Sequence, residues 1–201
     1  MMTIELFVSA GVLDVERKQA LAERILHALT TEDSAPDAVL NKARELTHVL
    51  VREPEVWATG GPAAPRYLVR LTVPGAWSNN PHFAEHVVPM ITEAIAATEP
   101  DPERLTREPH CVVQIVGLRE HGLATLGRTL TTTEITKLMT DDYRSSGETR
   151  RAPDGFVIDP VCGMTVELAT ADFTLTHNGI DYAFCAPVCR KVFAEEHAIP
   201  A

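Results

Sequence analysis

Apolar and polar residues near the N-terminus alternate first with the period of a strand and then with the period of a helix. Ile4, Leu6 and Val8 are separated by single residues, which is typical of a half-buried strand. Asp14 then fits a helix N-cap, and apolar residues recur every three or four positions after it. We therefore predict a β-α-β unit whose strand, two helices and second strand cover residues 3–9, 15–29, 34–44 and 47–52.

The same order of elements recurs further along the chain. Asn80 and Pro81 fit the N-cap and first position of a helix, and Pro89 inside it predicts a kink or a restart. The glycines that punctuate the two units lie at nearly constant offsets, since 75 − 11 = 64 and 127 − 61 = 66. These offsets indicate tandem units. The second has elements over 67–73, 80–97 and 111–116, followed by a short helix to residue 139.

A polar stretch separates these units from a third, shorter segment. Residues 141–155 contain glycine and proline and lack apolar periodicity, so they predict a linker. Beyond it, apolar runs flank Asn178-Gly179, a strong short-range signal for a β-hairpin. We therefore predict an α+β protein with a domain over 1–140, this linker, and a small module over 156–201.

The composition is that of a folded, acidic chain. Of 201 residues 45% are hydrophobic and 23% charged, and Lys+Arg 18 against Asp+Glu 28 gives a net charge of −10. This charge disfavours a nucleic-acid backbone or an anionic membrane as a partner, because both require basic surface. No apolar run approaches the ~20 residues that cross a bilayer, and the N-terminus lacks the pattern of a secretory signal. We therefore expect a cytoplasmic protein whose cysteines stay reduced.

Three of the four cysteines lie in the small C-terminal module. A hairpin and one helical turn within about forty residues bury too little surface to fold unaided, and a metal ion is the constraint that suits reduced cysteines. Cys185 and Cys189 are four positions apart, which places both thiols on one face of a helix, and Cys162 precedes the hairpin. The alternative is that these cysteines are small buried hydrophobic residues. Cys111 opens a predicted core strand and is expected to be of that second kind.

The C-terminal module resembles a YHS domain over roughly residues 159–197. The residues that carry the resemblance are Asp159-Pro160-Val161-Cys162-Gly163-Met164, Gly179, Tyr182, Phe184-Cys185, Cys189 and Phe193. YHS domains resemble treble-clef zinc modules, in which two ligands separated by two residues precede a glycine. The resemblance implies that Asp159 takes the place of a missing thiolate, with His177 or water as the alternative fourth ligand.

The metal site implied by this resemblance consists of Asp159, Cys162, Cys185 and Cys189. Three thiolates and an oxygen suit zinc, and three thiolates also suit Cu(I), so we expect one zinc or copper ion per chain. His82 and His86 lie four apart on the second main helix, but no third ligand is near them in the sequence. We interpret these two histidines as part of an exposed helix face.

The two β-α-β units resemble the tautomerase superfamily, in particular its macrophage migration inhibitory factor-like and haloacrylate dehalogenase-like members. The resemblance extends over about residues 2–139 and rests on the stretches 4–11, 15–29, 57–61 and 123–130. It implies a mixed sheet backed by two helices and a homotrimer with pockets between subunits. Trp57 matches an aromatic position of the pocket.

The reactive residues of the tautomerase family are replaced at the matching positions. The family uses an N-terminal proline as its base, and Met2 stands at that position. Val12 stands where the family carries an arginine, and valine cannot bind a carboxylate. If processing exposed Thr3, its α-amino group would be a weak substitute base.

The sequence thus favours a metal-binding protein in which a non-catalytic tautomerase-like scaffold carries a YHS module. Such a protein would bind, sense or transfer zinc or copper. The alternative is a tautomerase-type isomerase or lyase that uses a base other than an N-terminal proline. In that case the YHS module would be a structural or regulatory appendage.

Overall fold

The chain forms two compact units in a computed structural model. The residues that the structure describes are 1–31, 34–61 and 63–199. The first unit contains residues 1–31 and 46–119, and the second contains residues 34–45 and 120–199. Both units contain helices and strands, so the expected α+β class is confirmed. Among the described residues, no helix has the length and apolar character needed to cross a bilayer.

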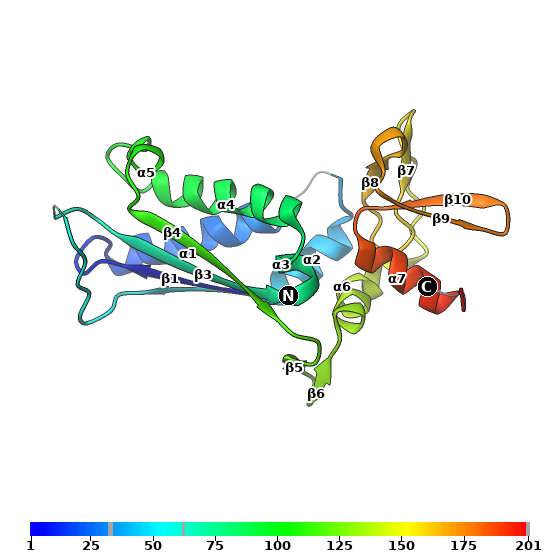
Figure 1. Ribbon diagram of the computed structural model, residues 1–201, viewed down its shortest axis with the longest axis horizontal. Helices are drawn as coiled ribbons and strands as arrows, with labels where there is room; N and C mark the ends of the chain where they lie inside the picture. Colours follow the sequence, from blue (N-terminus) through cyan, green and yellow to red (C-terminus); the bar gives the residue numbers. More distant parts are fainter. Residues whose placement is uncertain (32–33, 62, 200–201) are drawn as a thin grey trace. The chain divides into compact units, whose positions relative to one another are not determined.

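A four-stranded mixed sheet is the centre of the first unit (Figure 1). Its strands are β1 (Met2–Val8), β2 (Thr47–Arg52), β3 (Tyr67–Pro74) and β4 (Cys111–Leu118), and its helices are α1 (Val15–Leu29), α3 (Gly75–Ser78), α4 (Pro81–Ala96) and α5 (Arg104–Arg107). The strand order is β2-β1-β3-β4, in which β1 is parallel to β2 and antiparallel to β3, and β3 is parallel to β4. Two β-α-β segments, one built on α1 and one on α4, therefore form one sheet, as the tandem pattern predicted.

One face of this sheet and the two long helices enclose the core of the first unit. Ile4 of β1 and Leu71 of β3 are fully buried, and they form one cluster with Ile25 of α1 and Ile91 of α4. Every second residue of β1 is buried, which is the alternation that the sequence predicted. Pro89 does not divide α4, which runs continuously to Ala96.

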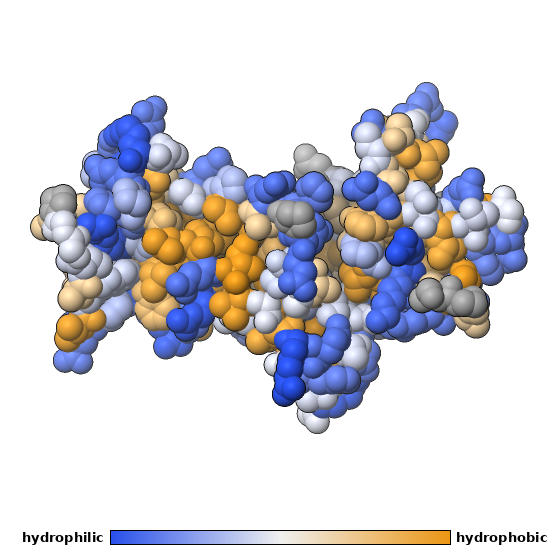
Figure 2. All heavy atoms as spheres, in the orientation of Figure 1, coloured by the Kyte–Doolittle hydropathy of each residue, from blue (hydrophilic) through white to orange (hydrophobic). Residues whose placement is uncertain are grey.

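The opposite face of the sheet carries exposed apolar side chains. Leu50 of β2 pairs with a β1 residue whose two chain neighbours are buried in the core. Val112 and Val116 of β4 likewise pair with β3 residues whose chain neighbours are buried. All three side chains are exposed. Figure 2 shows apolar side chains on the face of the first unit that is turned to the viewer. The sheet therefore has one covered face and one open face.

Short β-ribbons and helices make up the second unit. Its elements are α2 (Asp37–Glu45), β5 (Leu123–Thr125), β6 (Arg128–Leu130), α6 (Thr132–Ser146), β7 (Phe156–Ile158), β8 (Thr165–Glu167), the 3-10 helix η1 (Leu168–Thr170), β9 (Phe173–His177), β10 (Ile180–Phe184) and α7 (Pro187–Glu196). β5 pairs with β6, β7 with β8, and β9 with β10, each pair antiparallel.

Helix α6 is longer than the sequence predicted. Thr131 Oγ1 accepts a hydrogen bond from Glu134 N at 3.2 Å, and the Glu134 carboxylate accepts one from Thr131 N at 2.8 Å. This capping box begins the helix, which then continues to Ser146. Residues 141–146 of the predicted linker are therefore helical. Tyr143 is buried there within an otherwise polar stretch, and a single buried aromatic residue gives no periodicity to detect.

Helix α2 packs with the C-terminal part of the chain. The sequence placed this helix in the domain over 1–140; its partner in the structure is α6, and both helices lie in the second unit. The carbonyl oxygen of Ser34, just before α2, accepts hydrogen bonds from Arg150 Nη1 at 2.7 Å and from Thr165 N at 3.2 Å. The second unit is thus assembled from two separated parts of the sequence, and its limits differ from the predicted module over 156–201.

Candidate metal centre

A tight loop between β7 and β8 presents Cys162. Asp159 N donates a hydrogen bond to Met164 O, and Gly163 N donates one to Asp159 O, both at 2.8 Å. Gly163 has a φ of +72°, a left-handed conformation that glycine adopts at little cost. The loop reverses the chain within six residues and leaves the Cys162 side chain buried.

The β9–β10 hairpin and α7 present the other two cysteines. Asn178 and Gly179 form the predicted turn, and both have a positive φ, as a two-residue type I′ turn requires. Cys185 follows β10 directly, and Cys189 lies in the first turn of α7. The two thiols are therefore fixed by the end of a strand and the start of a helix.

The structure brings the three thiols together with the carboxylate of Asp159. Cys162 Sγ lies 3.4 Å from Cys185 Sγ, which lies 3.8 Å from Cys189 Sγ. One possible ligand atom from each of the four residues lies within 4.8 Å of the others, and the cysteines are free thiols. Sulfur ligands about 2.3 Å from a tetrahedral zinc ion are about 3.8 Å from one another. The thiols thus already have nearly the spacing of a metal site.

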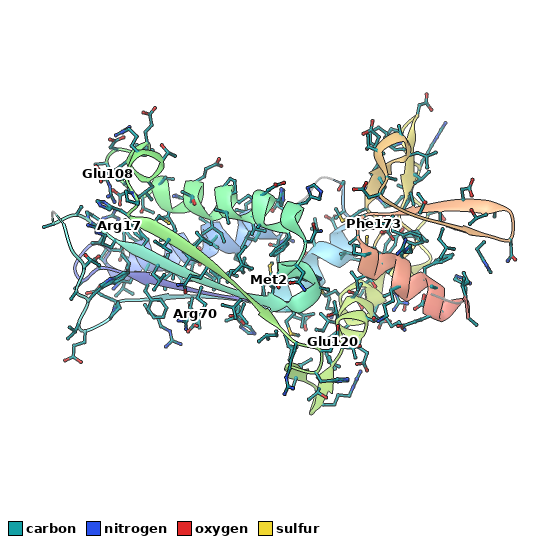
Figure 3. All side chains as sticks on the ribbon, in the orientation of Figure 1. Met2, Arg17, Arg70, Glu108, Glu120 and Phe173 are labelled. Atoms are coloured by element: carbon teal, nitrogen blue, oxygen red, sulfur yellow. The ribbon has the colours of Figure 1, made fainter. Side chains whose placement is uncertain are left out.

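Apolar side chains surround the thiols. Val161, Phe184 and Phe193 are buried in the same cluster, and Phe173 of β9 packs against it. Figure 3 shows Phe173 beside the beginning of α7. Cys162 and Cys189 are buried, whereas Cys185 is only half-buried. The cluster is therefore shielded from water except on the side of Cys185.

The Asp159 carboxylate joins the two cysteine-bearing segments. Its Oδ1 accepts hydrogen bonds from Val161 N at 2.8 Å and Cys162 N at 3.3 Å, and its Oδ2 accepts one from Cys185 N at 2.9 Å. The side chain is fully buried, and this burial, with the nearby Cys162 thiol, raises its pKa to about 7. Three donors leave acceptor capacity on a carboxylate, so Asp159 can position the thiols and still bind a cation.

The three thiols share their protons unequally. Hydrogen bonds with the Cys162 and Cys189 thiols lower the pKa of Cys185 to about 6. The pKa values of Cys162 and Cys189 are raised, because each thiol donates to a neighbouring sulfur and burial disfavours further negative charge. The cluster therefore favours one thiolate when it is empty. A cation would replace the remaining thiol protons and balance the added charge.

Residues far away in the sequence enclose the Cys162 loop. A Cβ added to Gly163 would lie 2.4 Å from Pro36 Cγ and 2.5 Å from Tyr143 Cζ. Arg150 Nη1 donates a hydrogen bond to Gly163 O. No local pattern marks Pro36, Tyr143 or Arg150, because they lie before α2, within α6 and in the predicted linker. The sequence signal of this enclosure was the glycine directly after Cys162, because glycine is typical of a position that has no room for a side chain.

The alternative ligand His177, and Cys111, which we expected in the core, lie outside this cluster. His177, the alternative fourth ligand, has its ring near those of Phe193 and His197 instead. Cys111 packs against the core of the first unit, where burial raises its pKa to about 11. The structure thus brings together the four residues of the implied metal site and leaves these two apart from them.

The positions taken from the tautomerase comparison are mostly apolar. Met2 begins β1 and is buried, and Val12 packs against the core. Trp57 lines a cavity of about 580 Å³ in the first unit. His82 is exposed on α4, with its Nδ1 3.3 Å from the Glu85 carboxylate, as expected for a solvated helix face.

Solved structures with tautomerase-superfamily folds match 63–73% of the chain. The crystal structure of Pt0534 inactivated by 2-oxo-3-pentynoate has 14% sequence identity and a TM-score of 0.50, covering 66% of this chain and 98% of its own. N1, a member of the cis-3-chloroacrylic acid dehalogenase family, has 17% identity and a TM-score of 0.49, covering 73% of this chain and 92% of its own. The fused 4-OT wild-type asymmetric trimer F6 has 21% identity and a TM-score of 0.48, covering 63% and 94%. The likeness to Pt0534 supports a tautomerase-like fold, and an identity this low concerns the fold alone.

One curated protein matches a short part of the chain. A copper-transporting P-type ATPase from Rhizobium leguminosarum bv. viciae is 46% identical over 44 residues. The match covers 22% of this chain and 5% of the ATPase, so it spans a small part of that relative. No protein-family profile matches the chain. The resemblance to YHS domains stays a prediction.

Proposed function

We propose that this protein binds one zinc or copper ion through the thiolates of Cys162, Cys185 and Cys189, with the Asp159 carboxylate as the fourth ligand. The observation that carries the proposal is the convergence of these four groups within 4.8 Å from two separated segments. In this proposal the YHS-like segment binds, senses or transfers the metal, and the tautomerase-like unit is its scaffold. We assign no catalytic residue, because Met2 and Val12 are apolar at the positions that the family uses.

Burial and charge support a metal rather than a purely apolar role for these cysteines. An apolar cysteine cluster does not need a buried carboxylate, yet Asp159 is fully buried beside the thiols. A buried acidic group is costly unless it is hydrogen-bonded and its charge is balanced. Backbone N–H groups supply the hydrogen bonds, and a bound cation would supply the charge.

Zinc and copper would use this donor set in different ways. Zinc takes four ligands in a tetrahedron, so it would use the carboxylate as well as the thiolates, whereas Cu(I) accepts three thiolates. The match to a copper-transporting ATPase supports testing copper alongside zinc. The ligands must be reduced to bind either metal, which agrees with our expectation of a cytoplasmic protein.

Metal content of the full chain tests the proposal. After reconstitution with Zn²⁺ or Cu⁺ under reducing conditions and desalting, we expect about one ion per chain. Cys189→Ser is expected to lower this to less than about a tenth of an ion, because a structural site is filled nearly stoichiometrically or not at all. The matched control, Cys111→Ser, removes a cysteine of the first unit and should change nothing. Near-zero content of both metals in the unsubstituted chain would overturn the proposal.

A second variant separates Asp159 from the thiolates. Asp159→Asn keeps the side-chain shape, but its amide nitrogen accepts no backbone N–H and is a poor ligand. We expect a metal affinity weaker by at least about tenfold, because the loss of a group that only supports the ligands already costs about tenfold to a hundredfold. Asp172→Asn, at an exposed position of the same unit, is the control. Equal affinities in the two variants would remove Asp159 from the site.

A further inference from the structure

A pair of histidines lies at the surface of the second unit. His177 is the last residue of β9, and His197 directly follows the last residue of α7. Their ring centroids are 5.2 Å apart, and the ring planes are inclined by 43°. The pair forms when the hairpin folds against the helix, so no local motif in the sequence predicts it.

Two imidazoles that share one metal ion have about this separation. A metal–nitrogen bond of about 2.0–2.1 Å, with the nitrogen about 1.1 Å from its ring centre, places each centroid about 3.2 Å from the ion. At a tetrahedral angle the two centroids are then about 5.2 Å apart. The observed centroid distance is the same. The separation of the two rings therefore fits two imidazoles that share one ion.

Neighbouring side chains hold both rings near this arrangement. The Phe193 ring lies 4.2 Å from the His197 ring and 6.2 Å from the His177 ring, between centroids. Asn178 Nδ2 lies 3.0 Å from His177 Nε2. A neighbouring group on the second ring nitrogen is typical of histidine ligands, and the Asn178 amide can turn its oxygen toward that nitrogen. The pair is thus partly ordered before any ion arrives.

The histidine pair is separate from the thiol cluster. Cys189, Phe193 and His197 follow one another at intervals of four residues, so they lie along one face of α7. The eight residues from the cysteine to the histidine correspond to about 12 Å along a helix. Phe193 is buried between them, while His197 is exposed and His177 half-buried. Ions in solution can therefore reach the pair without passing through the thiol cluster.

We propose that His177 and His197 form a second, solvent-facing metal site that binds a late first-row divalent ion such as Zn²⁺ or Cu²⁺. Imidazole nitrogen suits these ions, whereas Mg²⁺ and Ca²⁺ prefer oxygen. Water completes the coordination, so the ion at this site exchanges readily. The site goes beyond the thiolate site proposed above and does not depend on it, since the two share no ligand.

A Zn²⁺ titration of the full chain, followed by NMR of the histidine rings, tests the second site residue by residue. We expect the ring signals of His177 and His197 to shift together along one binding curve. The control is His27, which is exposed on α1 of the first unit and should not respond at the same zinc concentrations. The Cβ signals of the cysteines report the thiolate site in the same spectra. Failure of one site is therefore distinguishable from failure of the other.

Substitutions complete this test. His197→Gln is expected to abolish the response of His177 and to weaken zinc binding at the pair at least tenfold, and His177→Gln should do the same to His197. The control His27→Gln should leave both signals and their binding curve unchanged. The response should also persist in Cys189→Ser. Independent shifts of the two rings, or a His177 response that survives His197→Gln, would overturn the second site.

Discussion

Gly163 and Gly179 separate two effects that usually occur together, backbone strain and steric enclosure. Both have a positive φ, of +72° and +77° respectively. An added Cβ would meet Pro36 and Tyr143 at Gly163, whereas the space around Gly179 is open. The two glycines lie in the same unit. Gly163 follows Cys162, a proposed ligand, and Gly179 follows Asn178, which contacts His177. They therefore form a matched pair for testing whether the Cys162 loop is enclosed as described.

We predict a larger loss of stability for Gly163→Ala than for Gly179→Ala. The left-handed backbone alone costs about 1–2 kcal/mol in either variant. Overpacking against Pro36 and Tyr143 adds about 1–3 kcal/mol for Gly163→Ala. Urea unfolding, with retention of bound metal measured in parallel, gives the two free energies. Equal losses would show that the Cys162 loop is not enclosed in solution.

The protons on the thiols give a second prediction at this scale. The raised pKa values of Cys162 and Cys189 mean that both thiols carry protons near neutral pH, and a metal must displace them. Acidification adds competing protons, and each displaced proton weakens binding about tenfold per pH unit. We predict an affinity at least about a hundredfold weaker at pH 6.5 than at pH 7.5, because Asp159, with its pKa raised to about 7, also takes up a proton in this range. Competition with a chelator of known pH dependence measures this. A constant affinity would contradict thiolate binding.

Elements that depend on local signals could be predicted from the sequence. The alternation of β1, the Asp14 N-cap of α1 and the Asn178-Gly179 turn each act within a few residues, and the structure contains all three features. The end of α6 and the partner of α2 could not be predicted, because they depend on packing between segments far apart in the sequence. Tyr143 and Val39 are buried only because that packing occurs.

The candidate site shows the same division between local and distant causes. Cysteine spacing grouped the three cysteines, and the resemblance to treble-clef modules added Asp159 to them. The hydrogen bond from Cys185 N to Asp159 Oδ2 depends on how the hairpin meets the loop, and spacing does not predict it. The enclosure of the loop by Pro36 and the pairing of the two histidines could not be predicted either, because both depend on packing between segments far apart in the sequence.

Helix α2 is expected to stabilise the metal-binding unit. Val39 is 8% exposed on α2, which packs with α6. We predict that Val39→Asp destabilises the second unit by about 2–4 kcal/mol, because it buries an unpaired charge, and that it lowers metal retention. Val15→Asp is the control, since Val15 is 79% exposed at the start of α1. Unfolding and metal retention like those of the unsubstituted chain would show that α2 is not part of this unit.

At the scale of the whole molecule, we expect the open face of the first unit's sheet to bind a partner. Leu50, Val112 and Val116 are exposed on this face, opposite the helices. Exposed apolar patches on a sheet commonly mark protein–protein contacts. We propose that further copies of the chain cover this face, as in the homotrimer that the tautomerase resemblance implies.

The mass in solution tests this assembly. Three chains of 22.0 kDa give 3 × 22.0 = 66 kDa, the mass that light scattering is expected to report. The double variant Val112→Asp with Val116→Asp places charge on the open face and should shift the mass to that of one chain. Val56→Asp, at a position 83% exposed in the first unit, should leave it unchanged. A single-chain mass for the unsubstituted protein would contradict the trimer.

The central claim is that three thiolates hold one metal ion, and X-ray absorption of the reconstituted full chain tests it most directly. The account predicts about three sulfur ligands at about 2.3 Å from the metal, with one lighter ligand when the ion is zinc. Cys189→Ser should lower the sulfur count, and Cys111→Ser should not. A first coordination shell made only of nitrogen and oxygen would contradict the claim.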